Sequence, residues 1–125
     1  MMDEYIGIPF VAEGRSRDGC DCWGLIRLIY RDHKGIVLPT YTGYGDPLAR
    51  AATDLIEAGR VDWEKVTQPQ PYDAVLFLVR GQPHHIGLVI RPGWMIHTAR
   101  GKESCIESYN RPLWRSRIEG FYRVR

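Results

Sequence analysis

The stretch that decides the fold is residues 17–30, Arg17-Asp18-Gly19-Cys20-Asp21-Cys22-Trp23-Gly24-Leu25-Ile26-Arg27-Leu28-Ile29-Tyr30. It opens as a loop and continues in an apolar pattern of helical period, which Arg27 interrupts. Asp21 is a favourable N-cap residue, because its carboxylate can accept hydrogen bonds from free amides of the first turn. Cys22 then lies in that turn, where free N–H groups and the helix dipole favour a thiolate. Gly24 leaves one side of the turn bare, so that a substrate can approach the sulfur. The stretch therefore predicts a nucleophilic cysteine at a helix start.

Length and composition predict one folded domain that spans residues 1–125. The chain is 44% hydrophobic and 26% charged, which is ordinary for a globular protein with a single core. A net charge of +2 is too small to indicate nucleic acid as a partner. No stretch reaches the ~18 to 20 apolar residues that cross a membrane, and the N-terminus lacks the features of a secretory signal peptide. Three cysteines do not suggest a disulfide framework, so we expect a reducing cytoplasm.

The hydrophobic period changes from helical to strand-like halfway along the chain. After a short helix or turn and a loop in residues 1–16, a helix is expected from Cys22 to about His33, with an end at Gly35. A second helix, capped by Asp46, is expected to end at Gly59. After a Pro-punctuated link, short apolar runs predict strands at 74–79, 85–90, 94–99, 104–108 and 121–124. The short links between strands contain Gly or Pro, which favours antiparallel hairpins. The pattern predicts an α+β domain.

A cysteine nucleophile needs a base and a group that orients the base, and the strand histidines can supply both. If the second and third predicted strands form a hairpin, His85 falls opposite about Thr98, with His97 as its neighbour on the adjacent strand. One imidazole can then take the thiol proton while the other fixes its tautomer. His84 faces the opposite side of the strand, and His33 is expected to be a solvated cation at a helix end. The residues alone leave a non-catalytic alternative open, in which the cysteine is a buried hydrophobic residue and the histidines are ordinary polar side chains.

Four motifs carry a resemblance to a known family. They are Gly19-Cys20-Asp21-Cys22-Trp23-Gly24-Leu25, Gln70-Pro71-Tyr72-Asp73-Ala74-Val75-Leu76-Phe77, His85-Ile86-Gly87-Leu88-Val89-Ile90 and Met95-Ile96-His97-Thr98-Ala99, in this order. Over nearly the whole chain this arrangement resembles the NlpC/P60 family of papain-like cysteine peptidases. The resemblance implies N-terminal helices packed on an antiparallel sheet of five to six strands. It also implies Cys22 as nucleophile, His85 as general base and His97 as orienting residue, with no metal or organic cofactor.

The implied activity is hydrolysis of the peptide stems of peptidoglycan, commonly between D-γ-glutamyl and diaminopimelate or lysine, through an acyl-enzyme. The segments 21–25 and 35–39 resemble the phage-encoded, tail-associated branch of the family. That branch implies tail-tip or hub proteins as partners, and a location in the host cytoplasm during assembly and then in the virion tail. The residues expected to contact the substrate are Asp21, Trp23, Gly24, Phe10 and Tyr44.

Departures from the family pattern occur at three positions, Phe10, Tyr72 and Cys20, and only the first is expected to bear on activity. Phe10 stands where many relatives have a tyrosine whose hydroxyl reaches the oxyanion region, and it offers no donor. The strand-start motif has Tyr72 in place of a glycine. Cys20 is expected to be a free thiol and Cys105 to be a packing residue.

Other classes of function remain as alternatives. The first is a structural tail-tip assembly protein with a vestigial or partner-activated peptidase site. The second is a metal site formed by Cys20, Cys22, His84 and His85, which is disfavoured because one residue between two cysteines is a tight spacing for zinc. A Cys-x-Cys redox protein would leave the histidines unexplained.

Overall fold

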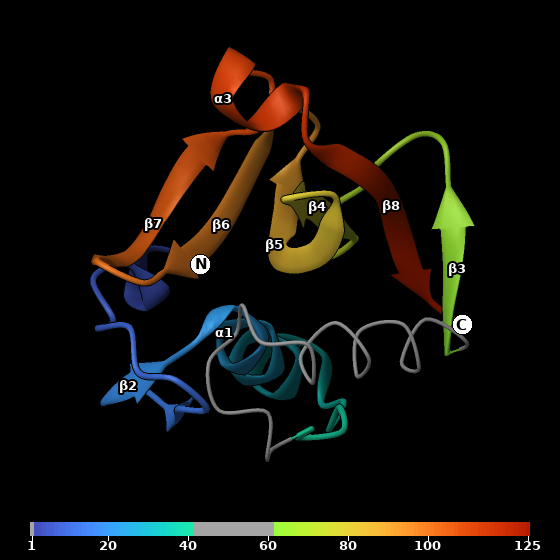
Figure 1. Cartoon of the computed structure of the whole chain (residues 1–125). Coiled ribbons are helices and arrows are strands. Elements are labelled where there is room, and N and C mark those ends of the chain that lie inside the picture. The colour runs from blue at the N-terminus through green and yellow to red at the C-terminus, as the bar shows by residue number, and fades with distance from the viewer. Residues whose placement is uncertain (1, 42–61) are drawn as a thin grey trace.

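The computed structural model describes residues 2–41 and 62–125 of the chain. A short helical part precedes a strand-rich part, as Figure 1 shows, which confirms the predicted α+β class. The elements are a 3-10 turn η1 (Asp3–Tyr5), β1 (Arg15–Ser16), β2 (Gly19–Cys20), α1 (Cys22–Ile29), a π-helical turn η2 (Tyr30–Lys34), β3 (Trp63–Val66), β4 (Ala74–Val79), β5 (Gln82–Arg91), β6 (Trp94–Ala99), β7 (Lys102–Ser108), α3 (Pro112–Arg115) and β8 (Ile118–Val124). The helix expected between Asp46 and Gly59, and Tyr44 before it, lie outside the described residues. Within the described residues, no helix has the length and apolar character that a bilayer crossing requires.

Six antiparallel strands form the main sheet, in the order β3-β8-β4-β5-β6-β7. Consecutive hairpins join β4 to β7, as the Gly- and Pro-containing links predict. After α3, strand β8 returns to lie between β3 and β4. One strand was not among those expected: residues 63–66 form the edge strand β3, in which Trp63 pairs with Val124. Only the return of β8 supplies that partner, so no local pattern marks the strand.

Helix α1 begins at the predicted residue, but its α-helical part is shorter than predicted. The Asp21 carboxylate accepts a hydrogen bond from the Gly24 N–H at 2.9 Å and caps the first turn. The α-helical geometry stops at Ile29, earlier than expected, and continues as the π-helical turn η2. Gly35 ends this turn with a φ of 66°, a left-handed conformation that glycine adopts without strain.

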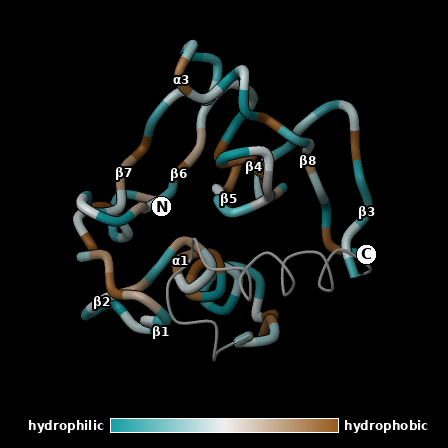
Figure 2. Tube along the Cα trace, viewed as in Figure 1, coloured by the Kyte–Doolittle hydropathy of each residue, from teal (hydrophilic) through white to brown (hydrophobic). Residues whose placement is uncertain are grey.

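The sheet carries a separate apolar core on each face, because strand side chains alternate. On one face, Leu88 and Ile96 pack with the buried side of α1. On the other face, Phe77 and Met95 pack with Trp114 of α3. Figure 2 shows apolar stretches on α1 and on the strands above it. The helix that begins at Cys22 is therefore held against the middle of the sheet.

The N-terminal arm is fastened to the edge strand β7. The Ser104 hydroxyl accepts from the Ile8 N–H at 2.8 Å and donates to the Tyr5 carbonyl at 2.5 Å. The chain then forms the small hairpin β1–β2, which the sequence analysis read only as a loop. This hairpin carries Arg15 to the start of α1.

Candidate active site

A buried carboxylate holds the start of α1. The Asp21 side chain is 1% exposed and accepts from the Gly24 N–H (2.9 Å), the Glu13 N–H (3.0 Å) and the Arg15 guanidinium (2.8 Å). A carboxylate committed to these donors fixes the first turn and the entering chain. The structure thus assigns Asp21 to positioning Cys22, and its burial argues against the expected contact with substrate.

The Cys22 side chain lies where β5 and β6 separate. In the described part of the chain, the β5–β6 ladder ends at the pair Leu88–Ile96, although both strands continue. Figure 1 shows α1 lying below the point where the two strands diverge. The backbone amides of Ile86 and Trp23 are near enough to the Cys22 thiol to lower its pKa. The thiol therefore lies in the neighbourhood of Ile86, which is the residue after His85 on β5.

The Cys22 thiol is protonated at neutral pH in this arrangement. Burial raises the pKa of Cys22 to about 12, and the charge of Asp21 raises it further, while the Ile86 and Trp23 amides only partly offset these effects. The side chain is 7% exposed. The expectation of a thiolate was wrong for this state, because desolvation of the charge outweighs the favourable field of the helix start. A base must take the proton before the sulfur can attack.

The structure brings the two strand histidines together. His85 Nε2 lies 2.9 Å from His97 Nδ1, as the hairpin predicts. The register differs by one residue from the expected one, since Val89 pairs with Met95. Continued along the strands, this register places Gly87 opposite His97. A Cβ on Gly87 would lie 3.4 Å from the His97 Cβ and 2.9 Å from the Met95 Sδ. The bare backbone at Gly87 therefore leaves room for the two imidazoles to meet.

The hydrogen-bond chain continues from His97 to the neighbouring strand β7. His97 Nε2 is 2.7 Å from Glu107 Oε1, and Lys102 Nζ is 3.2 Å from the same oxygen. Burial alone would raise the pKa of Glu107, but the hydrogen bonds from His97 and Lys102 outweigh it and lower the pKa to about 2. At neutral pH Glu107 is a carboxylate, which can only accept hydrogen bonds.

Both histidines are neutral at physiological pH. Burial lowers the pKa of His85 to about 3, and the nearby His97 and Lys102 act in the same direction. Burial also lowers the pKa of His97, against the opposing effect of Glu107. A neutral imidazole with one unprotonated nitrogen is the form that can act as a general base.

Aromatic rings enclose the histidine pair. The Trp114 ring stacks on His85 with centroids 5.2 Å apart and an interplanar angle of 26°, and it meets His97 edge-on at 5.1 Å. Phe77 contacts the His85 ring from β4 at 5.6 Å. Such an enclosure excludes water, which strengthens the hydrogen bonds inside it.

Sequence reasoning missed Glu107 and Trp114. The hairpin argument, applied across Gly101, would have placed Cys105 opposite His97 and Glu107 one step further on the same face, as the structure shows. No comparable signal marks Trp114, because its four-residue helix reaches the site only through the return of the chain to β8.

Three further residues were expected to contact substrate, and the structure gives each a different setting. A Cβ on Gly24 would overlap the Gly14 carbonyl oxygen, so the glycine accommodates the N-terminal hairpin, and the expected open approach to the sulfur was wrong. Trp23 is half-buried and donates from Nε1 to the Pro39 carbonyl at 2.8 Å. Phe10 is half-buried beneath the guanidinium of Arg100, which lies 5.3 Å from its ring centroid.

The remaining predictions concern His33, Cys20 and Cys105, and the structure does not agree with all of them. His33 is half-buried, with Nδ1 2.8 Å from the Tyr72 hydroxyl, so it is less solvated than expected. Cys20 is a free and fully buried thiol. Cys105 is a free, half-buried cysteine that lies beside His97 and Glu107.

The four-residue metal set considered from the sequence is not brought together in the described part of the chain. The group whose donor atoms lie within 4.8 Å of one another there is His97, Cys105 and Glu107. The Glu107 carboxylate already accepts hydrogen bonds from His97 and from the Lys102 ammonium, whose positive charge balances that of the carboxylate. We therefore assign the cluster to the hydrogen-bond chain of the site.

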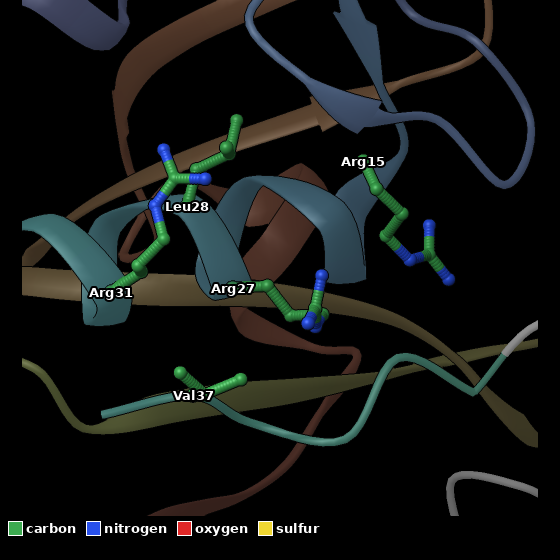
Figure 3. A pocket seen from close by; sticks show the side chains of 5 residues that line it. All are labelled: Arg15, Arg27, Leu28, Arg31 and Val37. Carbon is green, nitrogen blue, oxygen red and sulfur yellow. The ribbon is translucent and has the colours of Figure 1, made fainter. Parts of the chain in front are cut away.

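A small hollow of about 50 Å³ lies elsewhere, on the outer side of α1. Arg15, Arg27, Leu28, Arg31 and Val37 line it, and Figure 3 shows that their guanidinium groups point in different directions. It contains none of the residues of the hydrogen-bond chain. The candidate active site therefore consists of the hydrogen-bonded histidine pair with Glu107, and of Cys22 at the start of α1.

Comparison with known proteins gives results consistent with this site. The model of the NlpC/P60 family matches residues 7–123. Murein DD-endopeptidase MepS/murein LD-carboxypeptidase of Escherichia coli K12 is 24% identical over 127 residues, which cover 99% of this chain and 61% of that protein. Gamma-D-glutamyl-L-lysine dipeptidyl-peptidase of Bacillus cereus is 32% identical over 103 residues, which cover 80% of this chain and 27% of that protein. The chain thus spans well under two thirds of the length of both relatives.

The fold comparison agrees with the family model. The crystal structure of an NlpC/P60 family protein from Bacillus cereus superposes with a TM-score of 0.71 at 27% identity, covering 96% of this chain and 36% of that one. The shared fold has its helices beside an antiparallel sheet, as the sequence motifs implied. With a family model that matches nearly its whole length, the chain belongs to the NlpC/P60 family.

Proposed function

We propose that this chain is a cysteine peptidase that hydrolyses the peptide stems of peptidoglycan. Cys22 is the nucleophile, His85 the general base and His97 the orienting residue. The observation that carries the proposal is the hydrogen bond between His85 and His97, together with a Cys22 thiol whose pKa the amide of Ile86, the residue after His85, lowers. The names of the two relatives, a murein endopeptidase and a γ-D-glutamyl-L-lysine dipeptidyl-peptidase, support the class of substrate.

The protonation states favour a general-base mechanism. Cys22 and His85 are both neutral at rest, so His85 takes the thiol proton as the sulfur attacks the stem amide carbonyl. The oxyanion that forms can be stabilised by the backbone N–H of Cys22, at the start of α1. His85 then protonates the leaving amine, and the resulting acyl-enzyme is hydrolysed by a water that His85 deprotonates.

The phage-tail setting is the finer part of the proposal. The two segments that resemble the tail-associated branch are joined in the structure, since Trp23 donates to the Pro39 carbonyl at 2.8 Å and Arg27 donates to the Leu38 carbonyl at 2.9 Å. We propose that tail-tip or hub proteins are the partners, and that the chain moves from the host cytoplasm to the virion tail. Mass spectrometry of purified tails tests this, because tails that lack peptides of this chain would contradict it.

A second candidate function is a tail-tip assembly protein whose peptidase site is vestigial or activated by a partner. The burial of Cys22 favours it, since a nucleophile that is 7% exposed needs a local opening before a stem peptide can reach it. Phe10 favours it as well, because it offers no hydroxyl donor to an oxyanion.

The test is digestion of purified peptidoglycan, with the released muropeptides identified by mass spectrometry. The wild type should produce cleaved stems and Cys22→Ala should produce none, while Cys20→Ala, which removes a buried thiol two residues away, should retain cleavage. Cleavage that survives in Cys22→Ala would overturn the assignment of the nucleophile. Cleavage only when purified tails are added would select the partner-activated site, and no cleavage in either case would select the vestigial one.

A further inference from the structure

We propose that Glu107 is a positioning residue that sets the direction of the hydrogen-bond chain, so that His85 presents an unprotonated nitrogen to Cys22. The inference rests on the proposed peptidase function, which uses His85 as the base. Its decisive measurement does not depend on activity.

The order of donors and acceptors along the hydrogen-bond chain is set by Glu107, the one member that cannot donate a hydrogen bond. Glu107 is an ionised carboxylate 2.7 Å from His97 Nε2, so that nitrogen must carry the proton. A neutral His97 then has a lone pair on Nδ1, which lies 2.9 Å from His85 Nε2. His85 must therefore carry its own proton on Nε2, which leaves Nδ1 unprotonated. In the proposed mechanism, that nitrogen receives the thiol proton of Cys22.

Without the carboxylate, the opposite direction becomes available. His97 can then carry its proton on Nδ1 and donate to His85 Nε2, which forces the His85 proton onto Nδ1. A protonated Nδ1 cannot accept from the thiol, so this arrangement is inactive. Two hydrogen-bonded imidazoles thus have two possible arrangements of their protons. An acceptor beyond His97 selects the arrangement that leaves His85 Nδ1 unprotonated.

The surroundings keep the selection in place. Trp114 covers both imidazoles, which limits exchange of their protons with water. On the outer side, the Lys102 ammonium lies 3.2 Å from Glu107 and favours its ionised form. Glu107 hydrogen-bonds to His97, and His97 in turn to His85, so its part is positioning and not chemistry.

The decisive measurement is the tautomer of each histidine, read by long-range ¹⁵N–¹H NMR correlation at neutral pH. In the wild type, we expect the proton of both His85 and His97 on Nε2. Methionine has a similar length to glutamate and no comparable acceptor. In Glu107→Met, the Nε2-protonated tautomers of His85 and His97 should be lost or should mix with Nδ1-protonated ones. Glu103→Met, a change at an exposed glutamate on the same strand, should leave the tautomers unaltered. A His97 proton on Nδ1 in the wild type would overturn the proposal, whatever the activity.

Kinetics give the functional consequence. We expect Glu107→Met to lower kcat by about 10- to 100-fold, the usual scale for loss of a partner that orients an essential histidine, with little change in KM. Glu107→Gln should recover part of this loss, because its carbonyl can still accept from His97 Nε2 without a charge. Unchanged kcat in a folded Glu107→Met would overturn the proposal. An inactive wild type with the expected tautomers would instead count against the proposed function alone.

Discussion

Replacement of Asp21 by alanine is the sharpest test of how the fold builds the start of α1. The change removes one buried acceptor that serves three donors: the Gly24 N–H, the Glu13 N–H and the Arg15 guanidinium. The helix then loses its N-cap, the N-terminal hairpin loses its tether, and a charge-assisted contact disappears. Cys22 is the next residue, so the same change should also displace the sulfur.

The expected loss of stability can be assembled from these contacts. Loss of the N-cap costs about 1 kcal/mol. Loss of the acceptor for Glu13 and Arg15 adds roughly 2 kcal/mol, because hydrogen bonds to a charged group contribute about 1.5 to 3 kcal/mol. We use the lower part of that range because Arg15 keeps a hydrogen bond to the Thr40 carbonyl at 2.8 Å. The total is about 3 kcal/mol, a large share of the roughly 5 to 15 kcal/mol that stabilises a domain.

Urea denaturation followed by circular dichroism measures this loss. Asp21→Ala should lower the free energy of unfolding by about 3 kcal/mol. Asp21→Asn, which keeps one acceptor oxygen, should cost less. Asp18→Ala, at an exposed aspartate three residues earlier, should change it by less than about 0.5 kcal/mol. A loss below about 1 kcal/mol for Asp21→Ala would show that the buried carboxylate does not organise the turn.

Three other predictions concern backbone space, backbone strain and pH. Gly24→Ala should destabilise the fold by about 3 kcal/mol in urea denaturation, since its Cβ would overlap the Gly14 carbonyl; a neutral effect would contradict the close approach. Tyr72 has a φ of 75°, so Tyr72→Gly should be more stable than Tyr72→Ala by about 1 kcal/mol, because both lose the ring contacts and only glycine relieves the strain; equal stabilities would argue against strain. Below pH 6.5 an unfolded chain protonates His85, whereas the folded protein does so only near pH 3, so the free energy of unfolding should fall across this window by up to roughly 4 kcal/mol. His85→Gln should flatten the pH curve, and a curve as steep as that of the wild type would contradict the assignment.

Much of the fold was predictable because its signals are local. Asp21 and Gly35 mark the two ends of the helical segment, and both act in the structure as their chemistry predicts. The hairpins between β4 and β7 follow from short links with Gly or Pro. The meeting of His85 with His97 follows from the same hairpin geometry, since partners on adjacent strands are fixed by distance from the turn.

Other features depend on residues far apart in the sequence. Strand β3 exists because β8 returns from about 60 residues further along the chain to pair with it, and that return also brings Trp114 over the histidines. The hydrogen bond of Glu107 with His97 forms only because β7 lies beside β6. The role of Gly24 likewise appears only when the N-terminal hairpin packs on α1.

The division is clearest at Cys22. The sequence by itself determined the helix start and the hairpins that bring the histidines together, because capping, turn chemistry and strand alternation act between near neighbours. The protonation state of the sulfur was decided only by the tertiary structure. Burial raises the pKa of Cys22 to about 12, although the helix start would lower it. Desolvation depends on everything packed around the thiol, and here that packing outweighs the local field of one helical turn.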